Sequence, residues 1–434
     1  MSTAFATLGM LLLALLARVT LGSWATPGAF FAGVWFLYMV VSLGFSPWPA
    51  LDAGLWWMVL TIFCLYLGNL LVVLRHRRER TIPNLRPAET ERFPSLPGFV
   101  GLCLLGTIAY WALAPTYVLK DTQVKPPIML QFVLSCLYAL PLFCGLLFAS
   151  STRRSHRLLG LTNFVVAMII GAEFAGRSVV LMSFSLWSGT YFPASVLLNR
   201  GRFPLFTKER LTIAVVATTL MIANVSIATI SRGIGSAELI AENRLTGWQA
   251  ITDAVTWDGA VDSLVGLGSS TVGSIASFTW WFEQEWDNPH WSLDYLPALF
   301  SGPLEQLGLL ERENLRLESM AFDDATFSNV YTLFRPVIQA FTLPGSLIVV
   351  FSLGLLTGSA YERVCRGNPA PISILFMFYA GVMVSGGLFF GYNSLDLAYA
   401  IVTAYLIWCG RRLRRFYRSS TLRLRTAATP IPVS

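Results

Sequence analysis

The chain has 434 residues, of which 55% are hydrophobic and only 13% are charged, and its formal net charge is +7. A soluble domain carries roughly 25% charged residues, so the composition excludes an ordinary water-soluble enzyme. The apolar residues come in blocks long enough to cross a hydrocarbon core of about 30 Å. The sequence therefore predicts an all-α polytopic membrane protein, and its excess of basic residues concerns the membrane rather than nucleic acid.

About eleven transmembrane spans are predicted. The first block lacks a basic residue before it and is followed by Arg18, the wrong polarity for a cleaved signal peptide, so it is expected to be the first span. Residues 1–230 hold spans one to eight, 231–335 form a long loop, and 336–434 hold the last three spans and a basic tail. In chain order the predicted spans are 3–17, 28–45, 54–74, 98–116, 128–149, 158–175, 178–198, 211–230, 336–359, 371–391 and 396–410.

The basic residues predict the orientation of these spans. With the N-terminus outside, 23 of the 31 Lys and Arg residues fall in inner loops and in the C-terminal tail. Short loops rich in Lys and Arg stay on the cytoplasmic side of a membrane. The N-terminus and the long loop are therefore expected outside, and the C-terminus inside.

The long loop is expected to be ordered. It holds 15 of the chain's 24 acidic residues and six tryptophans, too many aromatic residues for a disordered linker. Residues 304–319 have the pattern of an amphipathic helix, and the Gly- and Ser-rich run 266–274 is typical of a bend. We expect re-entrant or interfacial helices here rather than an independent domain.

The catalytic motifs of soluble enzymes are absent from the sequence. It contains no P-loop, no nucleophile elbow, no HExxH and no glycine-rich dinucleotide motif. Its six cysteines include no CxxC pair and no Cys/His cluster. Neither a metal nor a cofactor is therefore expected.

Three arginines at the outer ends of predicted spans are candidates for an anion site. Arg177 follows Glu173 by four residues, Arg232 follows the eighth span, and Arg335 precedes the ninth. A guanidinium offers donors that match phosphate oxygens, and an arginine at membrane depth usually faces a cavity or a partner. The alternatives are an i,i+4 ion pair of Glu173 with Arg177 and simple anchoring to lipid headgroups. Arg244, within the loop, is a further candidate for substrate binding.

The outer loop also holds the candidate proton acceptors. His290 is the only histidine on the outer side, and Asp287 lies three residues before it. The pair Asp323 and Asp324 precedes the point where the chain re-enters the membrane. Either group could act as a general base. The alternative is an interfacial aromatic belt with solvated charges, because tryptophans flank His290.

The run Asn329-Val-Tyr331-Thr332 at the end of the loop is followed by spaced residues, Pro344, Gly345, Gly354, Gly358 and Tyr361. The chain also has a short first helix, a Gly-Arg-Ser turn (Gly176, Arg177 and Ser178) and a Leu-Pro run (Leu296 and Pro297). Together these features resemble a known family, the Wzy-type polymerases of oligosaccharide repeat units such as O-antigen. The resemblance extends from residue 1 to about 415. The chain departs from the family pattern at one place. The family has a D-F-G-like turn with an acidic residue, and this chain has no acidic residue at that place, between Phe341 and Gly345.

This resemblance implies a helical glycosyltransferase plan of the GT-C kind in the bacterial inner membrane. The implied activity joins oligosaccharide units carried on undecaprenyl pyrophosphate at the periplasmic face. Because no metal cluster is evident in the sequence, a metal-independent transfer is expected. The implied roles are pyrophosphate binding by the three arginines and substrate binding by Asn329 and Tyr331, and the implied partners are membrane lipids and a co-polymerase that regulates chain length. An O-antigen ligase, for which His290 would be the catalytic residue, and a transporter of lipid-linked sugars are the alternatives.

Overall fold

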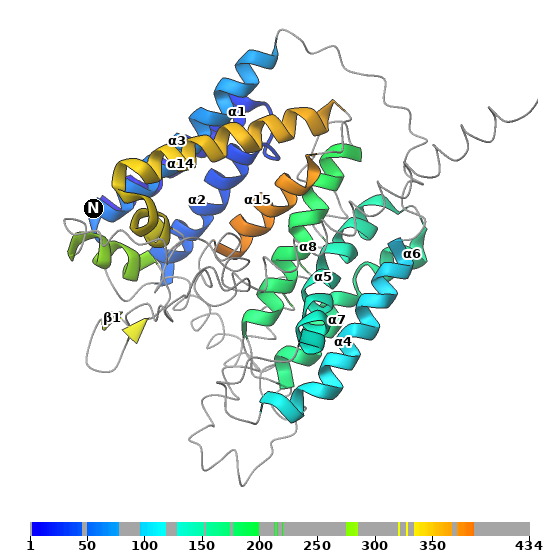
Figure 1. Cartoon of the computed structure of the whole chain (residues 1–434). Helices are drawn as coiled ribbons and strands as arrows, with labels where there is room; N and C mark the ends of the chain where they lie inside the picture. Colours follow the sequence, from blue (N-terminus) through cyan, green and yellow to red (C-terminus); the bar gives the residue numbers. More distant parts are fainter. Residues whose placement is uncertain are drawn as a thin grey trace, which may run out of the picture.

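The computed structural model describes most of the predicted spans and part of the long loop. The described residues are 2–45, 50–77, 96–118, 128–151, 153–173, 177–198, 212, 215, 219, 275–284, 320–321, 327–328, 334–366 and 371–385. They are helical throughout, apart from turns and one short antiparallel pair, β1 (Met320–Ala321) with β2 (Phe327–Ser328). The predicted all-α class is confirmed for this part of the chain (Figure 1).

The helix positions agree with most of the predicted spans. The apolar blocks form helices α1 (Ser2–Leu21), α2 (Pro27–Phe45), α3 (Asp52–Arg77), α4 (Leu96–Val118), α5 (Ile128–Ser150), α8 (Arg177–Leu198), α14 (Phe334–Cys365) and α15 (Ile372–Ser385). Three segments, Thr3–Leu21, Asp52–His76 and Phe334–Cys365, are long and apolar enough to cross a membrane by length and composition. The spans 211–230 and 396–410 lie outside the described residues apart from residues 212, 215 and 219. The total of about eleven spans and the division at residues 230 and 335 stay predictions.

The predicted span 158–175 is wrong as a single helix. The chain forms a short helix α6 (Arg154–Leu159), turns at Gly160, and then forms α7 (Thr162–Glu173). The turn is stabilised from another helix, because the indole Nε1–H of Trp187 in α8 donates to the carbonyl oxygen of Gly160 over 2.9 Å. A Cβ atom at Gly160 would lie 2.9 Å from the carbonyl oxygen of Cys144, so the close contact with α5 also requires glycine here.

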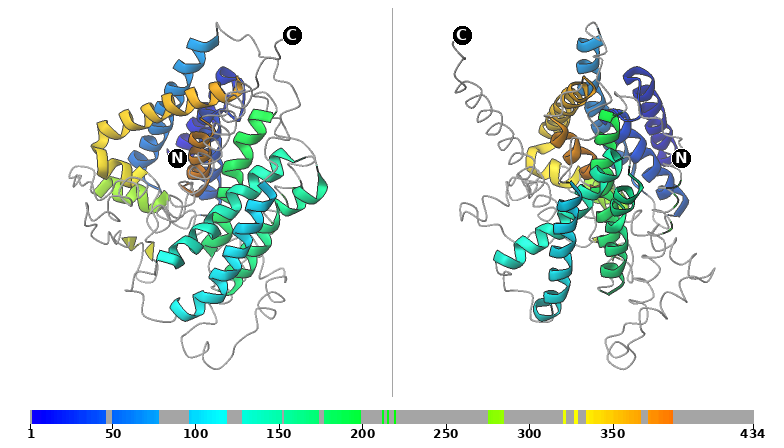
Figure 2. Two further views of the ribbon diagram at one scale, coloured as in Figure 1. Left: turned by 45° about the vertical axis from the view of Figure 1, so that its right-hand side comes forward. Right: turned by 90° about the vertical axis from the view of Figure 1, so that its right-hand side faces the viewer.

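The described helices form two groups with α15 between them. Figure 1 and the two further views in Figure 2 show α1, α2, α3 and α14 together in one group and α4, α5, α7 and α8 in the other. Helix α15 packs on α8 in the second group and on α2 and α14 in the first. Tyr379 of α15 joins the groups, since its ring meets those of Phe30 in α2 and Phe192 in α8 and its hydroxyl donates to the carbonyl oxygen of Ala25.

Helices α3 and α14 lie in backbone contact. A Cβ atom added to Gly354 would lie 2.4 Å from the carbonyl oxygen of Leu65, and one added to Gly68 would lie 2.4 Å from that of Phe351. Small residues spaced by four allow helix backbones to approach in this way, and Gly354 and Gly358 have that spacing. The spaced glycines after the long loop therefore have a packing role.

Asn69 connects three helices at the same contact. Its Nδ2 donates to the carbonyl oxygens of Leu65 in its own helix over 3.2 Å and of Gly354 in α14 over 3.0 Å. Its Oδ1 accepts from the backbone N–H of Gly28 over 3.4 Å. Gly28 is the second residue of α2, where an N–H has no partner within the helix, so this buried amide caps α2 while it holds α14.

Helix α14 is broken near its start. Thr342 has φ of 64° and ψ of 173°, and Pro344 follows it. A proline within a helix lacks the N–H donor and its ring collides with the carbonyl four residues earlier, which separates a short helix, 334–341, from the long remainder. Positive φ is a rare and unfavourable backbone state for a β-branched residue. The span predicted over residues 336–359 therefore extends from Phe334 to Cys365 and is broken at Thr342.

Candidate functional site

A helix from the predicted outer loop lies against the start of α3. Residues 275–284 form this helix, drawn in yellow-green in Figure 1. The hydroxyl oxygen of Thr279 accepts from the backbone N–H of Leu51 over 3.1 Å, and the carboxylate of Glu283 accepts from that of Ala53 over 3.4 Å. A carboxylate at a helix N-terminus also interacts favourably with the helix dipole. The contact is close, because a Cβ atom at Gly54 would lie 2.7 Å from the Cα atom of Thr279.

Aromatic rings connect this loop helix to α2, α3 and the start of α14. Phe278 and Trp35 of α2 both meet Phe334, with ring centroids 5.7 Å and 4.9 Å away. Phe282 stacks on Trp57 of α3 at 5.7 Å. The first residue of the short helix 334–341 is therefore fixed between α2 and the loop helix, which determines the position of the residue that follows it.

That residue is Arg335, and its side chain is buried. Only 3% of its surface is exposed. The guanidinium carbon lies 5.1 Å from the ring centroid of Trp281, a cation–π geometry, and Nε–H donates to Oε1 of Gln339 over 3.3 Å. A buried guanidinium is costly unless it has hydrogen-bond and electrostatic partners. Trp281 and Gln339 provide part of that compensation and orient the guanidinium plane.

The arrangement can bind an anion. A guanidinium carries five N–H donors in a planar fork that matches phosphate and carboxylate oxygens, and apolar rings around it strengthen its electrostatic interactions by excluding water. The break at Thr342 ends the short helix that carries Arg335. Within the described part of the chain no three His, Cys, Asp or Glu side chains gather as a metal site would require.

Arg335 is the one predicted site residue whose side chain the structure describes. The gathering of the three arginines at one site therefore stays a prediction. Arg177 is the first residue of α8 and Glu173 is the last of α7. The side chains of both lie outside the described part of the chain, so their i,i+4 ion pair stays a prediction. The other predicted site residues lie outside the described residues: Arg232, Arg244, His290, Asp323, Asp324, Asn329 and Tyr331.

Three residues of this site were not predicted from the sequence. Trp281 was one of the six loop tryptophans, Gln339 had no motif, and Glu283 was one of the loop's fifteen acidic residues. Glu283 caps α3 through Ala53. Glu283 follows two tryptophans at the end of an apolar segment. This is the only local signal in the sequence that could have suggested a loop helix packed on the membrane spans.

Comparisons with known proteins add no family to these observations. No family model, no curated protein and no solved structure matches this chain.

Proposed function

We propose that this protein is a polymerase that joins oligosaccharide repeat units carried on undecaprenyl pyrophosphate, at the periplasmic face of a bacterial inner membrane. Arg335 binds the pyrophosphate of the donor. The observation that carries the proposal is a buried arginine held against a loop tryptophan at the start of a broken apolar helix. The motif resemblance around Asn329, Tyr331 and the spaced glycines supports the same reaction.

The reaction is a glycosyl transfer between two lipid-linked sugars. The bond between the anomeric carbon of the growing chain and its pyrophosphate breaks, and a hydroxyl oxygen of the incoming unit forms a new bond to that carbon. The hydroxyl proton passes to a base, for which His290 and the pair Asp323 and Asp324 are the candidates. Undecaprenyl pyrophosphate leaves with the electron pair.

An arginine at the leaving group contributes directly to the rate. Negative charge accumulates on the pyrophosphate as the bond breaks, so a fixed cation stabilises the transition state more than the ground state. The donor is already activated, and no nucleotide-binding motif is required. We propose that the transfer is metal-independent, because the sequence has no cluster of metal ligands at a recognised spacing.

A ligase that transfers the finished polysaccharide to a lipid acceptor is the second candidate. It would use the same donor and the same cation, and His290 in the outer loop favours it. The two activities differ in product, since a polymerase extends the lipid-linked chain and a ligase moves it to another lipid. A transporter of lipid-linked sugars would form no new glycosidic bond.

The proposal is tested with purified protein in liposomes that contain lipid-linked repeat units. We expect a ladder of longer products, resistant to a chelator. Arg335→Ala removes one or more charge-assisted hydrogen bonds, each of roughly 1.5–3 kcal/mol, so the rate should fall by about 10- to 150-fold. Arg335→Lys should restore only part of it, because an ammonium does not bind in bidentate fashion.

The matched control is Arg363→Ala, which removes an exposed arginine from the other end of the same helix. It should leave the ladder unchanged. A folded Arg335→Ala protein with wild-type rates would refute the role of Arg335. Transfer to a lipid acceptor without a ladder would identify the ligase, and flipping of the lipid-linked units without transfer would identify the transporter.

A further inference from the structure

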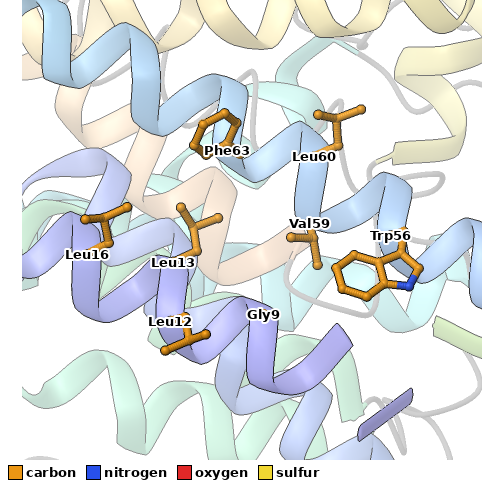
Figure 3. A pocket seen from close by; sticks show the side chains of 8 residues that line it. All are labelled: Gly9, Leu12, Leu13, Leu16, Trp56, Val59, Leu60 and Phe63. Carbon is orange, nitrogen blue, oxygen red and sulfur yellow. The ribbon is translucent and has the colours of Figure 1, made fainter. Parts of the chain in front are cut away.

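An apolar groove of about 600 Å³ runs between α1 and α3. Among the described residues its lining comes from these two helices, and the close-up in Figure 3 shows the residues along its length: Gly9, Leu12, Leu13, Leu16, Trp56, Val59, Leu60 and Phe63. Gly9 lies opposite Trp56, where a Cβ atom would come within 3.4 Å of the indole ring. Lining residues follow one another in the same direction along α1 and α3. This is expected because the two helices run parallel, with the antiparallel helix α2 connecting them in the sequence.

The chemistry of the groove fits a hydrocarbon chain. Every lining side chain is apolar except for the indole N–H of Trp56, and the volume lies within the range of about 300–1,000 Å³ typical of ligand sites. Leu12 is 58% exposed and Leu16 is 47% exposed. Exposed apolar surface of this extent marks a binding site or a membrane-facing surface. A polar ligand would find no partner for its hydrogen bonds here.

A series of contacts connects one end of the groove to the site of Arg335. Trp56 lines its end nearest the start of α3, and the next residue, Trp57, stacks on Phe282. Phe282 neighbours Trp281, whose ring lies against the Arg335 guanidinium. The groove lies on one side of α3, and the buried Arg335 lies past the loop helix that packs on an adjacent side. This arrangement suits a ligand with one long apolar chain and an anionic head.

We infer that this groove holds the polyprenyl chain of the lipid-linked donor while its pyrophosphate binds Arg335. The inference rests on the proposed function. A polyprenyl pyrophosphate combines one long hydrocarbon chain with an anionic head, which suits an apolar groove that a series of contacts connects to a buried arginine. The groove would then recognise the lipid chain of the donor, and the outer loop would recognise its sugars.

A side chain that fills the groove tests this inference. In Gly9→Leu the Cβ atom meets only ordinary contact distances, so the added branch enters the groove instead of displacing backbone. We expect the KM for a donor with a full-length polyprenyl chain to rise about tenfold, as loss of burial of a few methylene groups predicts. The KM for a donor with a two-isoprene chain should not change. The control is Gly101→Leu in α4, where an added Cβ atom has nothing within 4 Å.

A second measurement does not depend on turnover or on the variant. Wild-type protein in nanodiscs is irradiated with a polyprenyl pyrophosphate that carries a diazirine on its chain, and labelled peptides are identified. Label on residues 9–16 and 56–63, lost on adding unlabelled polyprenyl pyrophosphate but kept with excess phospholipid, supports the inference. Label that phospholipid removes equally, or label on other helices, overturns it.

The two measurements separate the two claims. Suppose that the wild-type protein makes a ladder but that Gly9→Leu changes the KM equally for long and short donors, or changes neither. That result refutes polyprenyl binding in the groove and leaves the proposed polymerase activity intact. Specific label in the groove without a ladder from any donor refutes the polymerase and leaves a polyprenyl-binding groove.

Discussion

Asn69→Ala should destabilise the group of helices that carries Arg335. The side chain is 1% exposed and makes two hydrogen bonds between helices, to the carbonyl oxygen of Gly354 and from the N–H of Gly28. Hydrogen bonds between helices in membrane proteins contribute about 0.6–1.7 kcal/mol each. Two of them give an expected loss of about 1–3 kcal/mol in the free energy of unfolding.

The measurement is unfolding of the purified protein in mixed micelles by titration with a denaturing detergent. Thr61→Ala is the matched control on the same helix. Thr61 is 2% exposed, and its hydroxyl donates to the carbonyl oxygen of Trp57 within α3, over 2.8 Å, a bond that connects no second helix. The control should therefore lose much less stability. If both variants unfold at the same detergent concentration, the connection of α2, α3 and α14 through Asn69 does not stabilise the protein as argued.

Three further predictions follow from other contacts. Gly354→Ala should force α3 and α14 apart, because its Cβ atom would lie 2.4 Å from a backbone oxygen; the same titration should detect a loss larger than that of Gly101→Ala. Trp281→Ala should weaken donor binding through loss of the ring beneath Arg335, and Trp281→Phe should restore part of it; donor KM measures this, and equal values in both variants would contradict it. On a background without cysteines, Ala53→Cys should react with an impermeant thiol reagent in intact spheroplasts and Ser155→Cys only after lysis; the reverse would invert the proposed orientation.

Hydropathy was sufficient to predict where most helices begin and end, because a long apolar block has no other stable form in a membrane. It failed where a tertiary contact interrupts such a block. The chain turns at Gly160 because Trp187 donates to its carbonyl oxygen and α5 approaches closely. Neither cause has a signal in the sequence around residue 160.

The candidate site was predictable only in part. Arg335 was identified by its charge at the edge of an apolar span, a local feature. Its partner Trp281 comes from a distant helix, and the loop holds six tryptophans that the sequence alone does not distinguish. Gln339 follows Arg335 by one helical turn, but an isolated glutamine has no recognisable pattern.

The contact between Gly68 and Gly354 also determines where hydrocarbon can go. Backbone atoms of α3 and α14 meet there with no room for even one added methyl group, so an acyl or prenyl chain cannot slip between these helices from the bilayer. On its flank toward α1, helix α3 borders the apolar groove. A hydrocarbon chain lying along α3 therefore has space beside α1 and none at the Gly68–Gly354 contact.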